Sequence, residues 1–188
     1  MRWLVFAILA WIFIGLEIGL RDVLAFGEDL AISPSLVLPL AALVALSATP
    51  RQTLVACLVL GLLVDLTSSH ELADAGGAVT IIGPAALGYM LAGKFVLTMR
   101  GLMIRHNPLT LVFLSIVGAM LVNAVIAAML SIRAIYDPIV WDGGGELLVR
   151  LGRSIYTGAP ALLVGLISPL LGAMLGLDHP PRHGRRVF

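Results

Sequence analysis

The chain is 188 residues long, and 60% of its residues are hydrophobic whereas only 12% are charged. This balance excludes an ordinary soluble domain, in which about 25% of residues are charged. The single cysteine, Cys57, excludes a disulfide framework and a cysteine-based metal site. We therefore expect a chain that lies in membrane lipid, with no metal, no cofactor and no nucleic-acid partner.

Six apolar runs approach the roughly 20 residues that a helix needs to cross about 30 Å of hydrocarbon. Lipid forbids unpaired backbone groups, and no alternating strand pattern appears, so these runs predict an all-α integral membrane protein with a bundle of six transmembrane helices. Residues 1–188 are read as a single transmembrane domain, with about 178–188 as a basic cytoplasmic tail. The predicted segments are Trp3–Leu20, Ile32–Ala48, Thr53–Leu66, Ala78–Leu97, Leu109–Leu130 and Ala159–Leu177.

The first segment is read as an uncleaved helix, because it is longer than a signal-peptide core and carries Glu17. An ionisable group inside a span is costly and suggests a function by default. Arg21 follows Glu17 at the i,i+4 spacing that suits an acid preceding a base. A local ion pair at the headgroup level is therefore the structural alternative for these two residues.

The second and third segments are joined by only four residues, 49–52, which is the length of a tight helix hairpin. Pro50 suits the first turn of the helix that follows. Asp65 then falls in the last turn of the third helix, where the helix dipole disfavours a carboxylate unless something compensates. We expect an arginine to do so, and the candidates are Arg21, Arg133, Arg150 and Arg153.

The distribution of lysine and arginine predicts the orientation of the bundle. Eight of these cations fall on the side that holds both termini and four fall on the other side, whereas the acidic residues are concentrated on the second side. Both termini of this multi-pass membrane protein are therefore expected in the cytoplasm.

Two features of the second half stand out. Asn123 lies in the outer part of the fifth segment, where it suits a hydrogen bond across helices, either as plain helix-to-helix contact or as part of a site. The outer stretch 146–156, ELLVRLGRSIY, has its apolar residues on one helical face. It predicts an amphipathic helix that lies at the membrane surface, packs on the bundle or contacts a partner.

Catalytic patterns do not emerge from the chain. It has no glycine-rich phosphate loop, no HExxH and no pairing of a nucleophile with histidine at a recognisable spacing. The four histidines fall on opposite sides of the predicted membrane. We therefore expect a protein that is not an enzyme.

The order of motifs resembles the rod shape-determining MreD family. The resemblance is carried by ISPSLVLPL at 32–40, by GLLVDL at Gly61–Leu66 and by ALGYMLAGK at Ala86–Lys94, followed by a basic inner loop. Gly61 and Asp65 are the residues that match the family motif. The segment LTSSHELADAGG after the aspartate is longer than the compact glycine- and proline-containing segment of that family.

The resemblance implies a non-enzymatic scaffold of the bacterial cell-elongation machinery, which maintains rod shape during peptidoglycan synthesis. Its expected partner is MreC and, through it, MreB, RodA and a penicillin-binding transpeptidase. The implied fold is similar to that of the substrate-binding components of energy-coupling-factor vitamin transporters. Such a transporter subunit is the alternative function. Subunits of this kind tend to present two alanines four residues apart on the first helix, whereas Ala7 and Ala10 here are three residues apart, which counts against this alternative. Ion translocation through Glu17 and Asp65 is a third alternative, and it requires a shared water-accessible interior.

Overall fold

The computed structural model describes residues 1–21, 23–25, 32–71, 78–103, 107–136 and 143–177. In these ranges the chain is predominantly helical, and a ladder of two short antiparallel strands joins the third and fourth helices. The predicted tail 178–188 and the middle of the predicted outer loop, 72–77, lie outside the described residues. The elements are α1 (Trp3–Gly19), α2 (Val37–Ser47), α3 (Pro50–Thr67), β1 (His70–Glu71), β2 (Ala78–Val79), α4 (Pro84–Met99), α5 (Pro108–Arg133), α6 (Gly143–Tyr156) and α7 (Gly158–Leu175).

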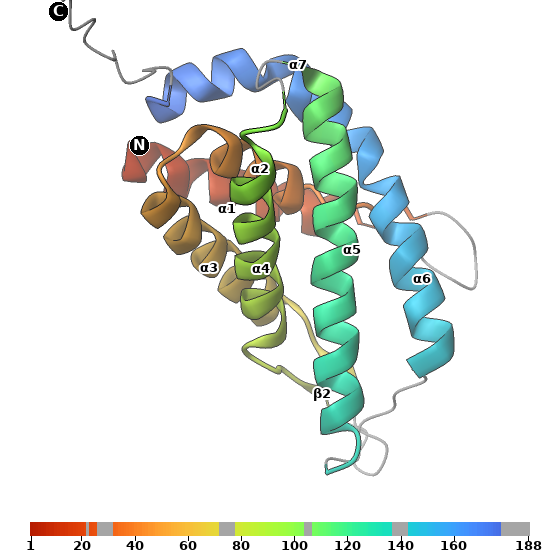
Figure 1. Cartoon of the computed structure of the whole chain (residues 1–188). Coiled ribbons are helices and arrows are strands. Elements are labelled where there is room, and N and C mark those ends of the chain that lie inside the picture. Colours follow the sequence, from red (N-terminus) through yellow and green to blue (C-terminus); the bar gives the residue numbers. More distant parts are fainter. Residues whose placement is uncertain (22, 26–31, 72–77, 104–106, 137–142, 178–188) are drawn as a thin grey trace, which may run out of the picture.

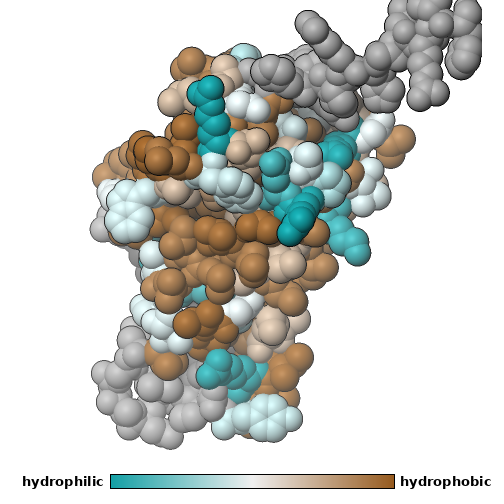
Figure 2. All heavy atoms as spheres, turned by 90° about the vertical axis from the view of Figure 1, so that its left-hand side faces the viewer, coloured by the Kyte–Doolittle hydropathy of each residue, from teal (hydrophilic) through white to brown (hydrophobic). Residues whose placement is uncertain are grey.

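The lengths and surfaces of the helices identify a membrane protein. Within the described ranges, three helical runs are long and apolar enough to cross a bilayer: Pro50–Thr67, Pro108–Arg133 and Gly144–Leu175, the last of which joins α6 to α7. A band of hydrophobic residues crosses the face shown in Figure 2, with hydrophilic residues gathered above and below it. On α1, Trp11 is 76% exposed. So broad an apolar surface is stable in lipid and not in water.

The helix α5 lies between α4 on one side and α6 on the other, and it contacts both (Figure 1). The helix α2 is enclosed, because every residue from Val37 to Leu46 is buried and α2 contacts α1, α3, α4, α5 and α7. Its 11 residues span only about 16 Å at 1.5 Å per residue. The predicted start of the second segment at Ile32 is therefore wrong, since the helix begins five residues later.

The turn between α2 and α3 is as tight as expected. Thr49 and Gln52 form a capping box and Pro50 occupies the first turn of α3. This arrangement satisfies backbone N–H groups that the first turn of a helix leaves without partners. The Arg100 guanidinium donates to the carbonyl oxygen of Ala48 at 2.7 Å, so the end of α4 is held against this turn.

The fourth predicted segment and the predicted amphipathic stretch begin at other residues than expected. Ala78 and Val79 form strand β2, and α4 begins only at Pro84, after Gly83 with a φ of +127°. A proline at the first turn and a glycine in a left-handed conformation are what this sharp entry requires. The predicted amphipathic stretch 146–156 is helical from Gly143 and continues almost directly into α7.

Candidate functional site

Asp65 sits where the end of α3 meets the beginning of α4, and its side chain is 4% exposed. Its Oδ2 accepts hydrogen bonds from the backbone N–H groups of Gly83 at 2.9 Å and Ala86 at 3.0 Å. Its Oδ1 accepts one from the N–H of Ala85 at 2.9 Å. Both carboxylate oxygens therefore cap a helix other than their own.

The prediction that an arginine offsets the unfavourable helix dipole at Asp65 is wrong. The first N–H groups of a helix have no partner inside the helix, and they carry the positive end of its dipole. The start of α4 supplies hydrogen-bond donors and a positive electrostatic potential, both of which stabilise the carboxylate. The end of α3 carries the opposite potential, which disfavours it. The compensating group is a helix terminus 18 to 21 residues away in sequence.

Gly61 lies one turn before Asp65 and packs against the same part of α4. A Cβ at this position would lie 2.5 Å from the Cα of Ala86 and 2.8 Å from the carbonyl oxygen of Ala85. Both are backbone atoms that no side-chain rotation can move away. The absence of a side chain at Gly61 lets α3 approach α4 closely enough for Asp65 to reach its terminus.

Glu17 caps a second helix in the same manner. The Glu17 Oε2 accepts from the backbone N–H groups of Leu36 at 2.8 Å and Val37 at 2.9 Å, and from the hydroxyl of Ser35 at 3.1 Å. The alternative in which Glu17 makes an ion pair with Arg21 is thus replaced by contacts with the beginning of α2. This capture of the α2 terminus explains why the helix begins at Val37.

Ser35 links three parts of the chain. Besides its bond to Glu17, its backbone N–H donates to the hydroxyl of Thr157 at 3.1 Å, and that hydroxyl donates to the carbonyl oxygen of Arg153 at 2.8 Å. The entry to α2 is therefore tied both to α1 and to the junction of α6 with α7.

A cavity of about 160 Å³ opens beside Glu17, and residues from all of α1 to α6 line it. Its charged lining residues are Glu17 and three arginines, Arg21, Arg150 and Arg153. Apolar side chains supply much of the remaining wall, together with hydroxyl groups and one amide. These other lining residues include Ile14, Ile18, Ser33, Ser35, Val64, Thr67, Ser68, Tyr89, Val122, Asn123, Ile126 and Thr157.

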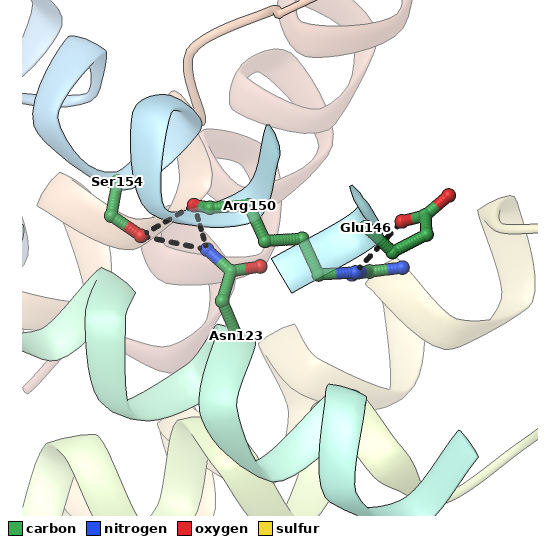
Figure 3. A network of polar contacts seen from close by, with 4 residues as sticks. All are labelled: Asn123, Glu146, Arg150 and Ser154. Atoms are coloured by element: carbon green, nitrogen blue, oxygen red, sulfur yellow. Dashed lines mark hydrogen bonds and ion pairs between the residues drawn. The ribbon is translucent and has the colours of Figure 1, made fainter. Parts of the chain in front are cut away.

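Asn123 fastens α5 to α6 at the wall of this cavity (Figure 3). Its side-chain amide donates to the hydroxyl of Ser154 at 2.9 Å and to the carbonyl oxygen of Arg150 at 3.3 Å. The Arg150 side chain extends away from Asn123 toward Glu146, with which it forms an ion pair at 3.2 Å. The network holds the arginine-bearing face of α6 in place.

The five residues singled out from the sequence thus fall into two groups. Gly61 and Asp65 form the contact between α3 and α4, whereas Glu17, Arg21 and Asn123 line the cavity. Asp65 is not among the cavity-lining residues in the described part of the chain.

Sequence reasoning did not identify Ser35, Tyr89, Arg153 or Thr157 as residues of one site. Serine and threonine are common in membrane helices, and the sequence suggests for Arg153 only a place on the polar side of the stretch 146–156 and a contact with Asp65. No local pattern distinguishes them, since their shared surroundings arise from contacts between distant helices. Among the described residues, no group of three or more His, Cys, Asp or Glu side chains is placed to hold a metal ion.

Comparison of the chain with protein-family models, curated proteins and solved structures finds no match.

Proposed function

We propose that this protein is a non-enzymatic scaffold of the bacterial cell-elongation machinery that binds MreC. In this proposal the bundle crosses the inner membrane six times, with both termini in the cytoplasm. It docks the membrane helix and outer domain of MreC and thereby connects to MreB, RodA and a penicillin-binding transpeptidase.

The observation that carries the proposal is the contact between α3 and α4. The two sequence blocks that resemble the MreD family, Gly61–Leu66 and Ala86–Lys94, meet in space. Asp65 from the first block accepts from the N–H of Ala86 in the second, and Gly61 leaves room for the same residue. Motifs that are separate in the sequence therefore form one structural unit, which favours their origin in a common fold over chance similarity in apolar sequence.

Co-purification with MreC tests this function. The full chain carries an affinity tag and is expressed with MreC in bacterial membranes, then solubilised in a mild detergent. We expect MreC to be retained at a level comparable with that of an established MreD protein, and an unrelated single-pass membrane protein not to be retained. Retention no higher than that of the unrelated protein, while the MreD control retains MreC, would contradict the proposal.

Two variants connect the test to the structure. Asp65→Ala removes the cap of α4 and is expected to lower the retention of MreC, because the ends of the bundle lose their arrangement. Thr98→Ala removes a single hydrogen bond at the exposed far end of α4, from the Thr98 hydroxyl to the carbonyl of Lys94, and is the matched control. Equal retention by both variants would show that the α3–α4 contact does not support partner binding.

The cavity favours a second candidate, a substrate-binding subunit of an energy-coupling-factor vitamin transporter. The first helix opposes it, because Ala10 is 2% exposed and so does not share an outward face with the exposed Ala7. A thermal-shift screen with vitamins separates the two functions. A ligand at a hundred times its dissociation constant stabilises the folded protein by about 2.7 kcal/mol, and no such shift is expected for the scaffold.

A further inference from the structure

Glu17 has one carboxylate oxygen that the cap of α2 does not use. Its Oε2 takes all three hydrogen bonds of the cap, and no described residue donates to Oε1. Glu17 is half-buried, and Oε1 is accessible, because the buried side-chain atoms without a partner among the described residues are Thr53 Oγ1, Ser115 Oγ and Arg153 Nε. Since Glu17 lines the cavity of about 160 Å³, its Oε1 is an unused acceptor beside that space.

Asn123 supplies a second acceptor, from α5. Its amide nitrogen makes both hydrogen bonds with α6, whereas its oxygen points away from Ser154 (Figure 3) and accepts none from the described residues. The hydroxyl of Ser68, also in the lining, donates to the carbonyl oxygen of Val64 at 2.9 Å, so its oxygen too is left as an acceptor. A ligand that satisfies these atoms must bring hydrogen-bond donors.

The arginines of the lining restrict the net charge of such a ligand. Arg150 is paired with Glu146, but Arg21 and Arg153 make no ion pair with Glu17 in the described part of the chain. Their guanidinium groups would repel an isolated cation. A molecule whose positive group is balanced by a negative one within the same molecule does not meet this barrier.

We propose that the cavity binds the primary ammonium group of a zwitterionic molecule, with Glu17 Oε1 and Asn123 Oδ1 as its acceptors. A primary ammonium has three N–H donors and no acceptor. Its hydrogen bond to a carboxylate is about twice as strong as a bond between neutral groups. A neutral hydroxyl or amide would leave the charge of a partly buried carboxylate without a counter-charge, which is the costlier arrangement.

The location admits two sources for the ammonium. The cavity lies at the end of α1, where the apolar segment gives way to the exposed Arg21, and Ile14, Ile18 and Val64 supply apolar wall. The head group of phosphatidylethanolamine and a soluble zwitterion such as glycerophosphoethanolamine both carry the required chemistry. The inference rests on Glu17, Asn123 and the cavity, and it holds whether or not the protein binds MreC.

Two matched pairs of probes test the proposal on the purified full chain in a non-ionic detergent. Phosphatidylethanolamine is compared with phosphatidylcholine of the same acyl chains by native mass spectrometry, and glycerophosphoethanolamine is compared with glycerophosphocholine by thermal shift. In each pair, methyl groups replace the N–H donors and the net charge stays the same. We expect the primary ammonium to bind about tenfold more tightly or more, the change that follows from one charge-assisted hydrogen bond.

The outcome of each pair identifies the source. A preference in the lipid pair indicates a lipid head group, and a preference in the soluble pair indicates a soluble ligand; either result supports the proposal. The absence of a preference in both pairs overturns it. Phosphatidylglycerol, which is anionic and has no ammonium, must bind more weakly than phosphatidylethanolamine, and equal binding of these two lipids also overturns it.

Substitutions localise the binding. Glu17→Gln removes the charge but keeps one oxygen that can cap α2, and it is expected to abolish the preference for the ammonium. Glu146→Gln makes the same change at an acid outside the lining and should keep the preference. Asn123→Ala removes the second acceptor and should reduce the preference in part, which keeps the test decisive even if Glu17→Gln does not fold. A preference that survives in both Glu17→Gln and Asn123→Ala, or that Glu146→Gln lowers equally, would contradict the assignment.

Discussion

The beginnings of α2 and α4 are built by the same device in different surroundings. Each is capped by a carboxylate that comes from the last turns of the preceding helix, Glu17 for α2 and Asp65 for α4. Asp65 uses both oxygens on backbone N–H groups, and its side chain is almost completely buried. The described contacts of Glu17 all go to one oxygen, and the residue also lines a cavity.

The comparison separates the roles of the two acidic residues, Asp65 at the start of α4 and Glu17 at the start of α2. At α4 the carboxylate is enclosed by a close helix contact and joins the end of α3 to the start of α4. At α2 it serves the fold and also contributes charge to a space that ligands or water can enter. The following substitutions are expected to separate these roles, and the effects are given from the largest to the smallest.

Gly61→Ala is expected to be the most damaging of these substitutions. The added Cβ meets backbone atoms of Ala85 and Ala86, so α3 and α4 must separate, at a cost of about 3 kcal/mol, the upper range for overpacking. Thermal unfolding in detergent measures the effect. Gly15→Ala, whose Cβ would meet nothing within 4 Å, is the control and should be neutral or slightly stabilising; similar melting of both variants would argue against the close contact.

Asp65→Ala is expected to cost about 2 kcal/mol, because three N–H groups at the start of α4 lose their acceptor at a buried position. Asp65→Asn keeps one acceptor oxygen and should cost about half as much. Chemical or thermal unfolding of the two variants in the same detergent gives the comparison. If Asp65→Asn is the more damaging of the pair, the cap does not depend on the number of acceptors.

Glu17→Ala is expected to cost less than Asp65→Ala, about 1.5 kcal/mol, although each acid accepts three hydrogen bonds. The smaller cost follows because Ser35 and Val37 line the cavity, so water can reach the N–H and hydroxyl groups that are released. Parallel unfolding measurements on both alanine variants check the order. A larger loss for Glu17→Ala would remove the distinction between the enclosed cap and the open one.

Asn123→Ala is expected to cost about 1 kcal/mol, since it removes the side-chain donors that join α5 to α6 at the cavity wall. The effect of this substitution on hydrogen exchange should be confined to one part of the bundle. Hydrogen exchange should increase in residues 150–154 of α6 and remain unchanged at the start of α4, around Ala85 and Ala86. Increased exchange at both places would show that the two regions are coupled and not separate.

Local chemistry accounts for the parts of the structure that were predicted correctly. The hairpin between α2 and α3 depends on Pro50 and on a capping box within residues 49–52, which are neighbours in sequence. The amphipathic pattern of 146–156 likewise reports a single helical face. The predicted starts of α2 and α4 are five and six residues too early. Ile32 lies before the polar and proline residues Ser33–Ser35, and Ala78–Gly83 is largely apolar, but in neither stretch is the backbone helical.

The sequence by itself determined that the protein is a helical membrane protein, since composition and the length of apolar runs decide which solvent the chain can occupy. It also marked Asp65 and Glu17, because a charge in an apolar run is conspicuous, whereas Gly61 was marked only by the resemblance to the MreD family motif. Only the tertiary structure decided what these residues contact. The acceptors and donors of each cap are 18 to 21 residues apart, and the arginines that line the cavity come from the turn after α1 and from α6, more than a hundred residues later. Such contacts depend on how the helices pack, which no local pattern encodes.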